Sequence, residues 1–323
     1  MPDDHVLGVD GGGTWTRAVI MRLDGTVVGR GQAGPSNPIT NGVEQALGNI
    51  IEAVNSAGQA SGVEEFKAST LGLAGATRSH LGEEIYDRLP NSYGVTKIVS
   101  DAHSALAGAT GCRPGVVVIA GTGSIAYGMN KKGEEARAGG WGWRLGDVGS
   151  GYAIGKNAII AALKDHDQSG PPTKLKEMVM GHLGLSDMEE IIDWAYSPER
   201  EASHFASIVP LVKEAENRGD SVASFIMENA GTQLGLVAQA VIKRLQLEGG
   251  FPVACSGGVF KQPNRYNRAF EETLREVAQT CEFIEPLFTP TVGSALLALK
   301  SLDVKISDGL QVNVGKSIRW FDE

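Results

Sequence analysis

Three aspartates in this 323-residue chain occupy positions where a carboxylate can do chemistry, each beside glycines or at the end of an apolar run. Asp10 follows the apolar run 6–9 and comes directly before a triple glycine. An apolar strand rarely ends in a carboxylate for packing reasons, because burying an unpaired charge is costly. Beside a triphosphate, the natural partner of Asp10 is Mg²⁺, held through water. The alternative is an aspartate that accepts hydrogen bonds from the turn amides.

A glycine-rich turn follows Asp10 and joins two predicted strands. Glycines let the backbone approach an anion closely, and successive N–H groups can form an anion nest. A dinucleotide-binding fingerprint would need a helix after the glycines, and a strand follows here. A second glycine-rich turn of this kind comes later in the chain. The phosphate-binding interpretation of this second turn depends on its match to the first. We expect both to bind phosphates: Gly11, Gly12, Gly13 and Thr14 in the first, Gly121, Thr122, Gly123 and Ser124 in the second.

Asp101 stands between a predicted strand at 97–100 and a predicted helix at 102–109. Ligands of α/β sheets bind at such carboxyl ends of strands. Aspartate is also a preferred helix N-cap, and capping alone would explain this position. A phosphoryl-transfer enzyme needs a carboxylate that orients the attacking hydroxyl and accepts its proton. Asp101 is the best-placed candidate for that base, with capping left open as the alternative.

Asp147 lies in the segment 139–151, which holds six glycines and two tryptophans in thirteen residues. Glycines permit close backbone approach, tryptophans offer apolar walls, and Asp147 can accept hydrogen bonds from sugar hydroxyls. The alternative is a tight loop with two packed tryptophans. The density of special residues favours a ligand site.

The elements that must position these residues follow from hydrophobic periodicity. A strand, a glycine turn and a returning strand occur twice, which predicts two similar α/β domains, 1–114 and 115–323, the second with helical additions. Asn41 is expected to cap a helix at 43–56, and residues 202–218 are read as one helix. The glycines in the segment 309–317 resemble those of a P-loop, but the spacing between them is wrong for that motif. We therefore interpret this segment as an irregular tail.

Composition excludes several classes of protein. The net charge of -9 argues against general nucleic-acid binding, because affinity for the phosphate backbone comes mostly from Lys and Arg. The six histidines show no metal-ligand spacing, and three cysteines are too few and too scattered for a disulfide framework. Neither a signal peptide nor a membrane span is recognised, so we expect a cytoplasmic protein that does not act on membranes.

Taken together, these motifs resemble the N-acetylglucosamine kinase and BadF/BadG/BcrA/BcrD ATPase family of the actin/hexokinase-like superfamily. The resemblance spans nearly the whole chain and is carried by the segments 9–14, 36–37, 71–75, 100–102, 119–124, 139–150 and 256–258. It implies a two-domain actin-like (ribonuclease H-like) α/β fold with an interdomain cleft. It also implies an ATP- and Mg²⁺-dependent kinase that converts an amino sugar into its 6-phosphate, often as a homodimer.

The resemblance assigns roles residue by residue. Gly11 to Thr14 and Gly121 to Ser124 hold the ATP phosphates, Gly257 and Gly258 lie near the adenosine, and Asp101 is the catalytic base. The sugar contacts are expected from Asn37, Asp101, Thr122, Gly140, Trp141 and Asp147.

Two positions depart from the family pattern. Many members carry Glu where this chain has Val148, and Lys where it has Trp15. We expect the first change to alter contacts to the sugar or to favour another hexosamine derivative. The second removes a positive charge near the phosphates, which Arg17 can partly replace. Two other functions remain open on the same fold: an ATPase that activates a dehydratase or reductase through an iron–sulfur cluster, and a non-catalytic sugar sensor.

Overall fold

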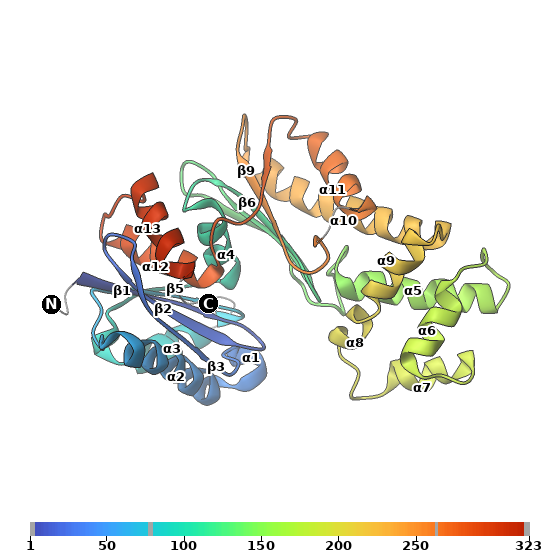
Figure 1. Cartoon of the computed structure of the whole chain (residues 1–323), viewed down its shortest axis with the longest axis horizontal. Coiled ribbons are helices and arrows are strands. Elements are labelled where there is room, and N and C mark those ends of the chain that lie inside the picture. Colours follow the sequence, from blue (N-terminus) through green and yellow to red (C-terminus); the bar gives the residue numbers. More distant parts are fainter. Residues whose placement is uncertain (1–3, 77–79, 262–263, 320–323) are drawn as a thin grey trace. The chain divides into compact units, whose positions relative to one another are not determined.

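The computed structural model describes residues 4–76, 80–261 and 264–319. The chain forms two compact units (Figure 1): unit 1 comprises Met1–Gly115 with Glu285–Glu323, and unit 2 comprises Val116–Ile284. The division expected from the sequence lies close to the first break. Residues 285–323, however, belong to unit 1 and not to the second domain, because their apolar side chains pack on the first sheet.

Unit 1 is built on a five-stranded sheet of order β3-β2-β1-β4-β5. The first three strands form an antiparallel meander, and β4 and β5 continue the sheet in parallel with β1. Parallel neighbours need crossover connections, and the chain enters β4 by way of α2 and β5 by way of α3. The strands are β1 (His5–Gly11), β2 (Thr16–Arg22), β3 (Val27–Ala33), β4 (Ala68–Leu73) and β5 (Val95–Val99).

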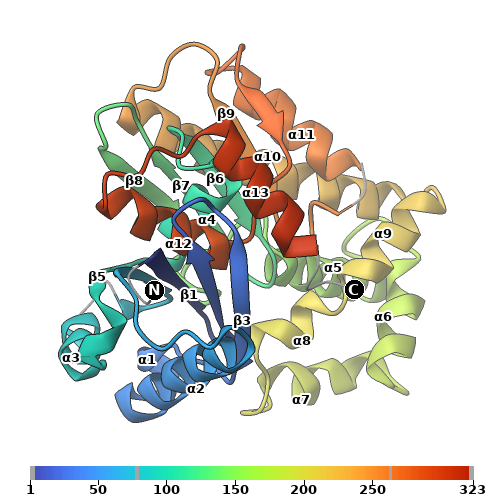
Figure 2. The ribbon, with the colours of Figure 1, turned by 60° about the vertical axis from the view of Figure 1, so that its left-hand side comes forward.

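Helices cover both faces of this sheet, as Figure 2 shows for the meander. Alternate side chains of β1 point to opposite faces, so Leu7 and Val9 pack toward α2, while Val6 packs toward α12. The helical elements are α1 (Pro38–Asn41), α2 (Val43–Ser61), α3 (Leu81–Arg88), η3 (Asn91–Tyr93), α4 (Asp101–Thr110), α12 (Pro290–Ser301) and α13 (Asp308–Arg319).

Unit 2 repeats the strand order of unit 1, as β10-β9-β6-β7-β8. The duplicated strand–turn–strand pattern predicted from the sequence is therefore confirmed. The strands are β6 (Gly115–Ala120), β7 (Ser124–Met129), β8 (Glu135–Gly139), β9 (Pro252–Ser256) and β10 (Glu282–Ile284).

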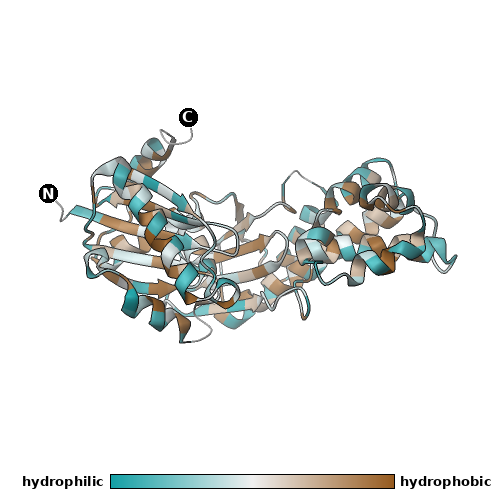
Figure 3. Ribbon diagram, turned by 90° about the horizontal axis from the view of Figure 1, so that it is seen from below, coloured by the Kyte–Doolittle hydropathy of each residue, from teal (hydrophilic) through white to brown (hydrophobic). Residues whose placement is uncertain are grey.

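The additions to unit 2 are helical, and apolar residues gather on the strands and on the helix faces beside them (Figure 3). Within the ranges described, no helix combines the length and the apolar character that crossing a membrane requires. The helical elements are α5 (Gly151–His166), α6 (Leu175–Leu183), η4 (Met188–Glu190), α7 (Ile191–Tyr196), α8 (Ala202–Ala206), α9 (Val209–Asn217), α10 (Ser221–Leu245) and α11 (Arg265–Arg275).

Three local predictions are wrong. The expected tail 309–317 lies inside the helix α13, because Leu310 and Val314 are buried against unit 1 and this packing outweighs the low helix propensity of glycine. The expected helix 202–218 is two helices, since Pro210 lies in the first turn of the second one and lacks the N–H that a continuous helix needs. Asn41 caps nothing: it ends α1, and Gly42 precedes α2.

Candidate active site

The first glycine turn is the tip of the β1–β2 hairpin. The Gly12 N–H donates to the Trp15 carbonyl at 3.0 Å, which closes the turn around Gly13 and Thr14. A β-carbon on Gly13 would meet no atom within 4 Å, so the tip borders open space. An open, glycine-lined backbone is what a phosphate-binding turn requires.

Two neighbouring segments hold the base of this turn. The Ser36 N–H donates to the Gly12 carbonyl at 3.0 Å, and the Ala74 N–H donates to the Gly11 carbonyl at 2.8 Å. The fully buried Ser36 hydroxyl lies where a side chain on Gly11 would be, and it has no hydrogen-bond partner among the described residues. Any residue larger than glycine at position 11 would displace it.

Asn37, the expected sugar contact of unit 1, is set beside this turn. Its Oδ1 accepts a hydrogen bond from the Ile39 N–H at 3.0 Å, which makes Asn37 the N-cap of the short helix α1. The same oxygen lies 2.7 Å from the place of a β-carbon on Gly75, just after β4. Asn37 therefore stands next to the carboxyl end of β4, as a ligand contact at that sheet edge should.

Asp10 and Asp101 influence each other within unit 1. Burial raises the pKa of Asp10 to about 7, and the negative charge of Asp101 adds to this, while Arg17 opposes it. Arg17 is directly opposite Asp10 in the β1–β2 ladder, and its Nε donates to Gln32 Oε1 at 3.2 Å. Two carboxylates with an arginine on one side form a site suited to a cation and to phosphate oxygens.

Asp101 begins α4 but does not cap it. The N-cap is Ser100, whose Oγ accepts a hydrogen bond from the His103 N–H at 3.2 Å. Asp101 is the first residue of the helix, its side chain is exposed, and its Oδ1 accepts from the Ala102 N–H at 2.9 Å. The capping alternative is therefore wrong, since Ser100 is the N-cap of α4.

The second glycine turn joins β6 to β7 in unit 2 and is anchored on the start of α5. The N–H groups of Gly151 and Tyr152 donate to the carbonyls of Gly121 and Thr122 at 2.8 and 3.1 Å. Ser150 caps α5 through a hydrogen bond from Ala153. A β-carbon on Gly121 would meet nothing within 4 Å, so this turn too borders open space.

Gly257 and Gly258 follow β9 and lie beside the end of β6. Gly257 adopts φ of 106°, which favours glycine, and a side chain there would collide with the Ala120 backbone. The N–H of Val259 donates to the Ala120 carbonyl at 3.1 Å. The structure thus brings these two glycines next to the second glycine turn, while Gly258 borders open space.

Asp147 lies against the second glycine turn. Its Oδ2 is 2.7 Å from the place of a β-carbon on Gly123, and only 7% of the residue is exposed. Its backbone has φ of 56°, a conformation that non-glycine residues seldom adopt and that surrounding contacts must maintain. One such contact is the hydrogen bond from Ser124 Oγ to the Val148 carbonyl, at 2.7 Å.

The two tryptophans of the segment 139–151 have different roles. Trp143 packs edge-on against Tyr152 with ring centroids 5.2 Å apart, so it is part of the core as the structural alternative proposed. Trp141 is 61% exposed, packs on Gly146, and carries the guanidinium of Arg137 at 4.6 Å from its ring centre. Gly140 connects this segment to the turn, because its N–H donates to the Ser124 carbonyl at 2.9 Å.

Each unit therefore assembles one set of the predicted residues. Unit 1 brings together the first turn, Asp10, Asn37 and Asp101, and unit 2 brings together the second turn, Asp147, Gly140 and the Gly257–Gly258 pair. Reading the sequence missed Arg137 and Ser150. Ser150 was detectable, because a serine before an apolar helix is a capping signal. Arg137 was not, since its stacking on Trp141 depends on the fold of the loop.

The cysteines bear on the iron–sulfur alternative. A cluster needs thiolate ligands. Burial raises the pKa of Cys255 to about 12 and also raises that of Cys281, which favours the neutral thiol at both positions. Within the described ranges, no three His, Cys, Asp or Glu side chains gather as metal ligands would.

Comparison with known proteins identifies the family. The model of the BadF/BadG/BcrA/BcrD ATPase family matches residues 7–298. The chain belongs to this family. Among curated relatives, the N-acetylmuramic acid/N-acetylglucosamine kinase of Clostridium acetobutylicum is 35% identical, and the alignment covers 93% of this chain and 99% of the relative. The N-acetyl-D-glucosamine kinase of Dictyostelium discoideum is 32% identical with the same coverage.

Solved structures agree with this placement. A candidate N-acetylglucosamine kinase from Chromobacterium violaceum superposes with a TM-score of 0.74 and 27% identity, covering 93% of this chain and all of that one. A ROK family glucokinase from Streptomyces griseus shares the fold at 19% identity, with a TM-score of 0.54. The two-domain actin-like fold expected from the sequence is confirmed.

Proposed function

We propose that this family member is an ATP-dependent kinase that phosphorylates an amino sugar, N-acetylglucosamine or a close derivative, on its 6-hydroxyl. The observation that carries the proposal is Asp101, an exposed carboxylate that starts α4 beside Asp10 while Ser100 does the capping. The relatives with curated names support the substrate class.

Asp101 is the residue we assign as catalytic base. In phosphoryl transfer most of the catalysis is positioning and charge neutralisation, so the base need only orient the sugar hydroxyl and accept its proton late. A strongly raised pKa at Asp101 is therefore not needed. The two glycine turns, with Thr14 and Ser124, supply backbone N–H donors to the ATP phosphates, and Gly258 borders the space assigned to the adenosine.

The residues present fit a Mg²⁺ ion that reaches the site with ATP. Mg²⁺ prefers oxygen ligands and keeps several waters, so one or two carboxylates suffice to hold it. Asp10 is the carboxylate we assign to it, and the mutual repulsion of Asp10 and Asp101 is what a cation at that place would relieve. The ion would neutralise charge on the transferred phosphoryl group.

The sugar contacts we propose are those that the family resemblance assigns. They are Asn37, Asp101, Thr122, Gly140, Trp141 and Asp147. Val148 follows Asp147 and is 39% exposed. Where many family members place a carboxylate, this chain therefore presents an apolar side chain, which favours a sugar with an additional apolar or anionic substituent.

A coupled assay of ADP release tests the proposal. Mg·ATP is offered with glucose, glucosamine, N-acetylglucosamine, N-acetylmannosamine or N-acetylmuramic acid, and ³¹P NMR identifies the phosphorylated carbon. We expect strong turnover with at least one amino sugar and a 6-phosphate product. ATP binding without sugar-stimulated ADP release would contradict the proposal and favour the activator or the sensor. The Asp101→Asn protein is the matched control for contaminating kinases.

Two further properties complete the proposal. We propose a homodimer, on the resemblance to the family alone, and light scattering on the eluting protein would test it by giving twice the mass of one chain. We also propose a cytoplasmic location, because the reaction consumes ATP and the three cysteines are free thiols.

A further inference from the structure

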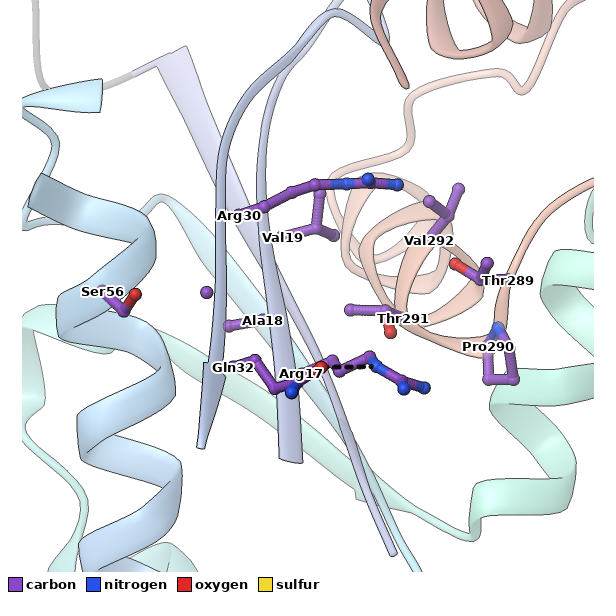
Figure 4. A pocket seen from close by; sticks show the side chains of 11 residues that line it. Arg17, Ala18, Val19, Arg30, Gln32, Ser56, Thr289, Pro290, Thr291 and Val292 are labelled. Atoms are coloured by element: carbon purple, nitrogen blue, oxygen red, sulfur yellow. Dashed lines mark hydrogen bonds between the residues drawn. The ribbon is translucent and has the colours of Figure 1, made fainter. Parts of the chain in front are cut away.

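A cavity of about 530 Å³ opens in unit 1 on the face of the sheet that α12 covers (Figure 4). The strands β2 and β3 form one wall, and the first turn of α12 forms the other. The volume lies in the range of small-molecule sites and far exceeds that of a single inorganic ion. Its lining residues are Arg17, Ala18, Val19, Arg30, Gly31, Gln32, Ser56, Thr289, Pro290, Thr291 and Val292.

The charge of this cavity is positive. In the β2–β3 ladder Arg17 pairs with Gln32 and Val19 pairs with Arg30, so the two arginines occupy diagonal positions on one face of the sheet. Figure 4 shows both guanidinium groups extending toward the start of α12. Within the described ranges, no acidic side chain lines the cavity.

The opposite wall supplies hydrogen-bond donors. Thr289 is the N-cap of α12 but makes no side-chain capping bond, and Pro290 has no N–H. The N–H groups of Thr291 and Val292 belong to the first turn, where a helix offers donors without an intrahelical partner. Two threonine hydroxyls and the positive end of the helix therefore face the two guanidinium groups.

We infer that this cavity binds the phosphate group of a phosphorylated small molecule. Two arginines together with backbone and hydroxyl donors exceed what a carboxylate can accept, and they match the three terminal oxygens of a phosphate monoester. The remaining volume has room for a sugar or a nucleoside attached to that phosphate. Both kinds of phosphate ester occur in the proposed reaction, as its nucleotide and as its product.

The cavity is linked to the proposed reaction through Arg17, which faces Asp10 across the β1–β2 ladder. Arg30 pairs with Val19 in the β2–β3 ladder, whereas the residue opposite Asp10 is Arg17. Arg30 is therefore the residue to change, because its substitution perturbs the cavity and leaves the Asp10 pairing in place. The binding test below needs no kinase activity. Because ADP and the sugar phosphate are also ligands of the proposed active site, the comparison of wild type with the Arg30 variant decides the result.

Isothermal titration calorimetry on the full chain tests the inference, with inorganic phosphate, ADP and N-acetylglucosamine 6-phosphate as separate probes. We expect at least one probe to bind, and Arg30→Gln to weaken that binding about tenfold, the effect of losing about 1.4 kcal/mol. Arg30→Lys should restore part of the affinity. Arg22→Gln, which changes an exposed arginine of β2 outside the cavity, should leave every affinity within about twofold.

The probes distinguish the sources of the phosphate. If Arg30→Gln weakens the binding of ADP alone, the cavity binds a nucleotide. If it weakens the binding of the sugar phosphate alone, the cavity binds the product. If it weakens the binding of all three probes, the cavity recognises the phosphate group alone. Thr289→Val, on the opposite wall, should weaken the same probe and serves as a second variant if Arg30→Gln unfolds. Equal affinities of wild type and both variants for every probe, or no binding of any probe, would overturn the inference.

Discussion

The Oδ2 atom of Asp147 lies 2.7 Å from the place where a β-carbon on Gly123 would be. The second glycine turn and the proposed sugar contact are thus in direct contact in unit 2. Gly123→Ala should push the carboxylate aside, because Asp147 is buried and has little room to move. A hydrogen bond to a charged group contributes about 1.5–3 kcal/mol, so we expect KM for the sugar to rise about tenfold to a hundredfold. Steady-state kinetics would show this, and an unchanged sugar KM would contradict the role of Asp147.

Asp101→Asn should abolish most sugar phosphorylation. A general base contributes about 100- to 10,000-fold, and asparagine cannot accept the hydroxyl proton. ATP binding should persist, as calorimetry can establish. The matched control is Ser100→Ala, which removes the cap of α4 and costs about 1 kcal/mol of stability but keeps the carboxylate. Near-normal turnover of Asp101→Asn would rule out the assignment.

Ionisation of Asp10 should lower the free energy of unfolding as pH rises. Its pKa is about 7 in the native protein, raised mainly by burial, and lies near 3.8 without that environment. The native state therefore holds the extra proton between about pH 4 and pH 7, and the free energy of unfolding declines across that window. Asp10→Asn should flatten this slope and raise the melting temperature at pH 8. The measurement is thermal unfolding in Mg²⁺-free buffer; the same slope in both proteins would refute the prediction.

Alanine at Gly13 or Gly121 should leave the stability of the free protein unchanged but should weaken the binding of ATP. A β-carbon at either position meets no atom within 4 Å, so the melting temperature should not fall. The space is assigned to phosphates, and a methyl group there should raise KM for ATP about tenfold. Gly8→Ala is the contrasting variant, since its β-carbon would strike the backbone of Ala295 and should destabilise unit 1. Normal ATP kinetics in both Gly13→Ala and Gly121→Ala would place the nucleotide elsewhere.

Asp220 should stabilise unit 2 above pH 4. Burial alone would raise its pKa, but hydrogen bonds from the Ala223 and Lys174 N–H groups and the Thr173 hydroxyl outweigh it and lower the pKa. The stabilisation is present above the ordinary pKa of an aspartate and is lost as pH falls below it.

Asp220→Ala should therefore cost about 2–4 kcal/mol at pH 7, because it removes the cap of α10 and leaves buried donors unpaired. The exposed cap Asp187 is the control: Asp187→Ala removes one hydrogen bond, to Glu189, and should cost less than about 1 kcal/mol. Urea unfolding measures both. Similar costs for the two variants would show that the contacts of Asp220 with residues 173 and 174 contribute nothing.

The elements nearest the candidate site were predictable because their signals are local. A β-branched run ending in Asp10 and three glycines indicates a strand and a turn, and the repeat of that pattern at Gly121 predicts the second sheet. The strand–helix junction at Asp101 is likewise visible in the periodicity. Assigning the cap to Ser100 needed the structure, since two adjacent residues that both suit an N-cap cannot be separated by type.

The local sequence was thus enough to predict the duplicated strand–turn–strand pattern, the two glycine turns and the candidate carboxylates. Only the tertiary structure decided that the last segment returns to unit 1 as α12 and α13, that Asp147 lies against Gly123, and that Arg17 and Arg30 share a cavity. Turns and strands follow from neighbouring residues, whereas these arrangements depend on how separate elements pack together, and such packing overrides local propensity.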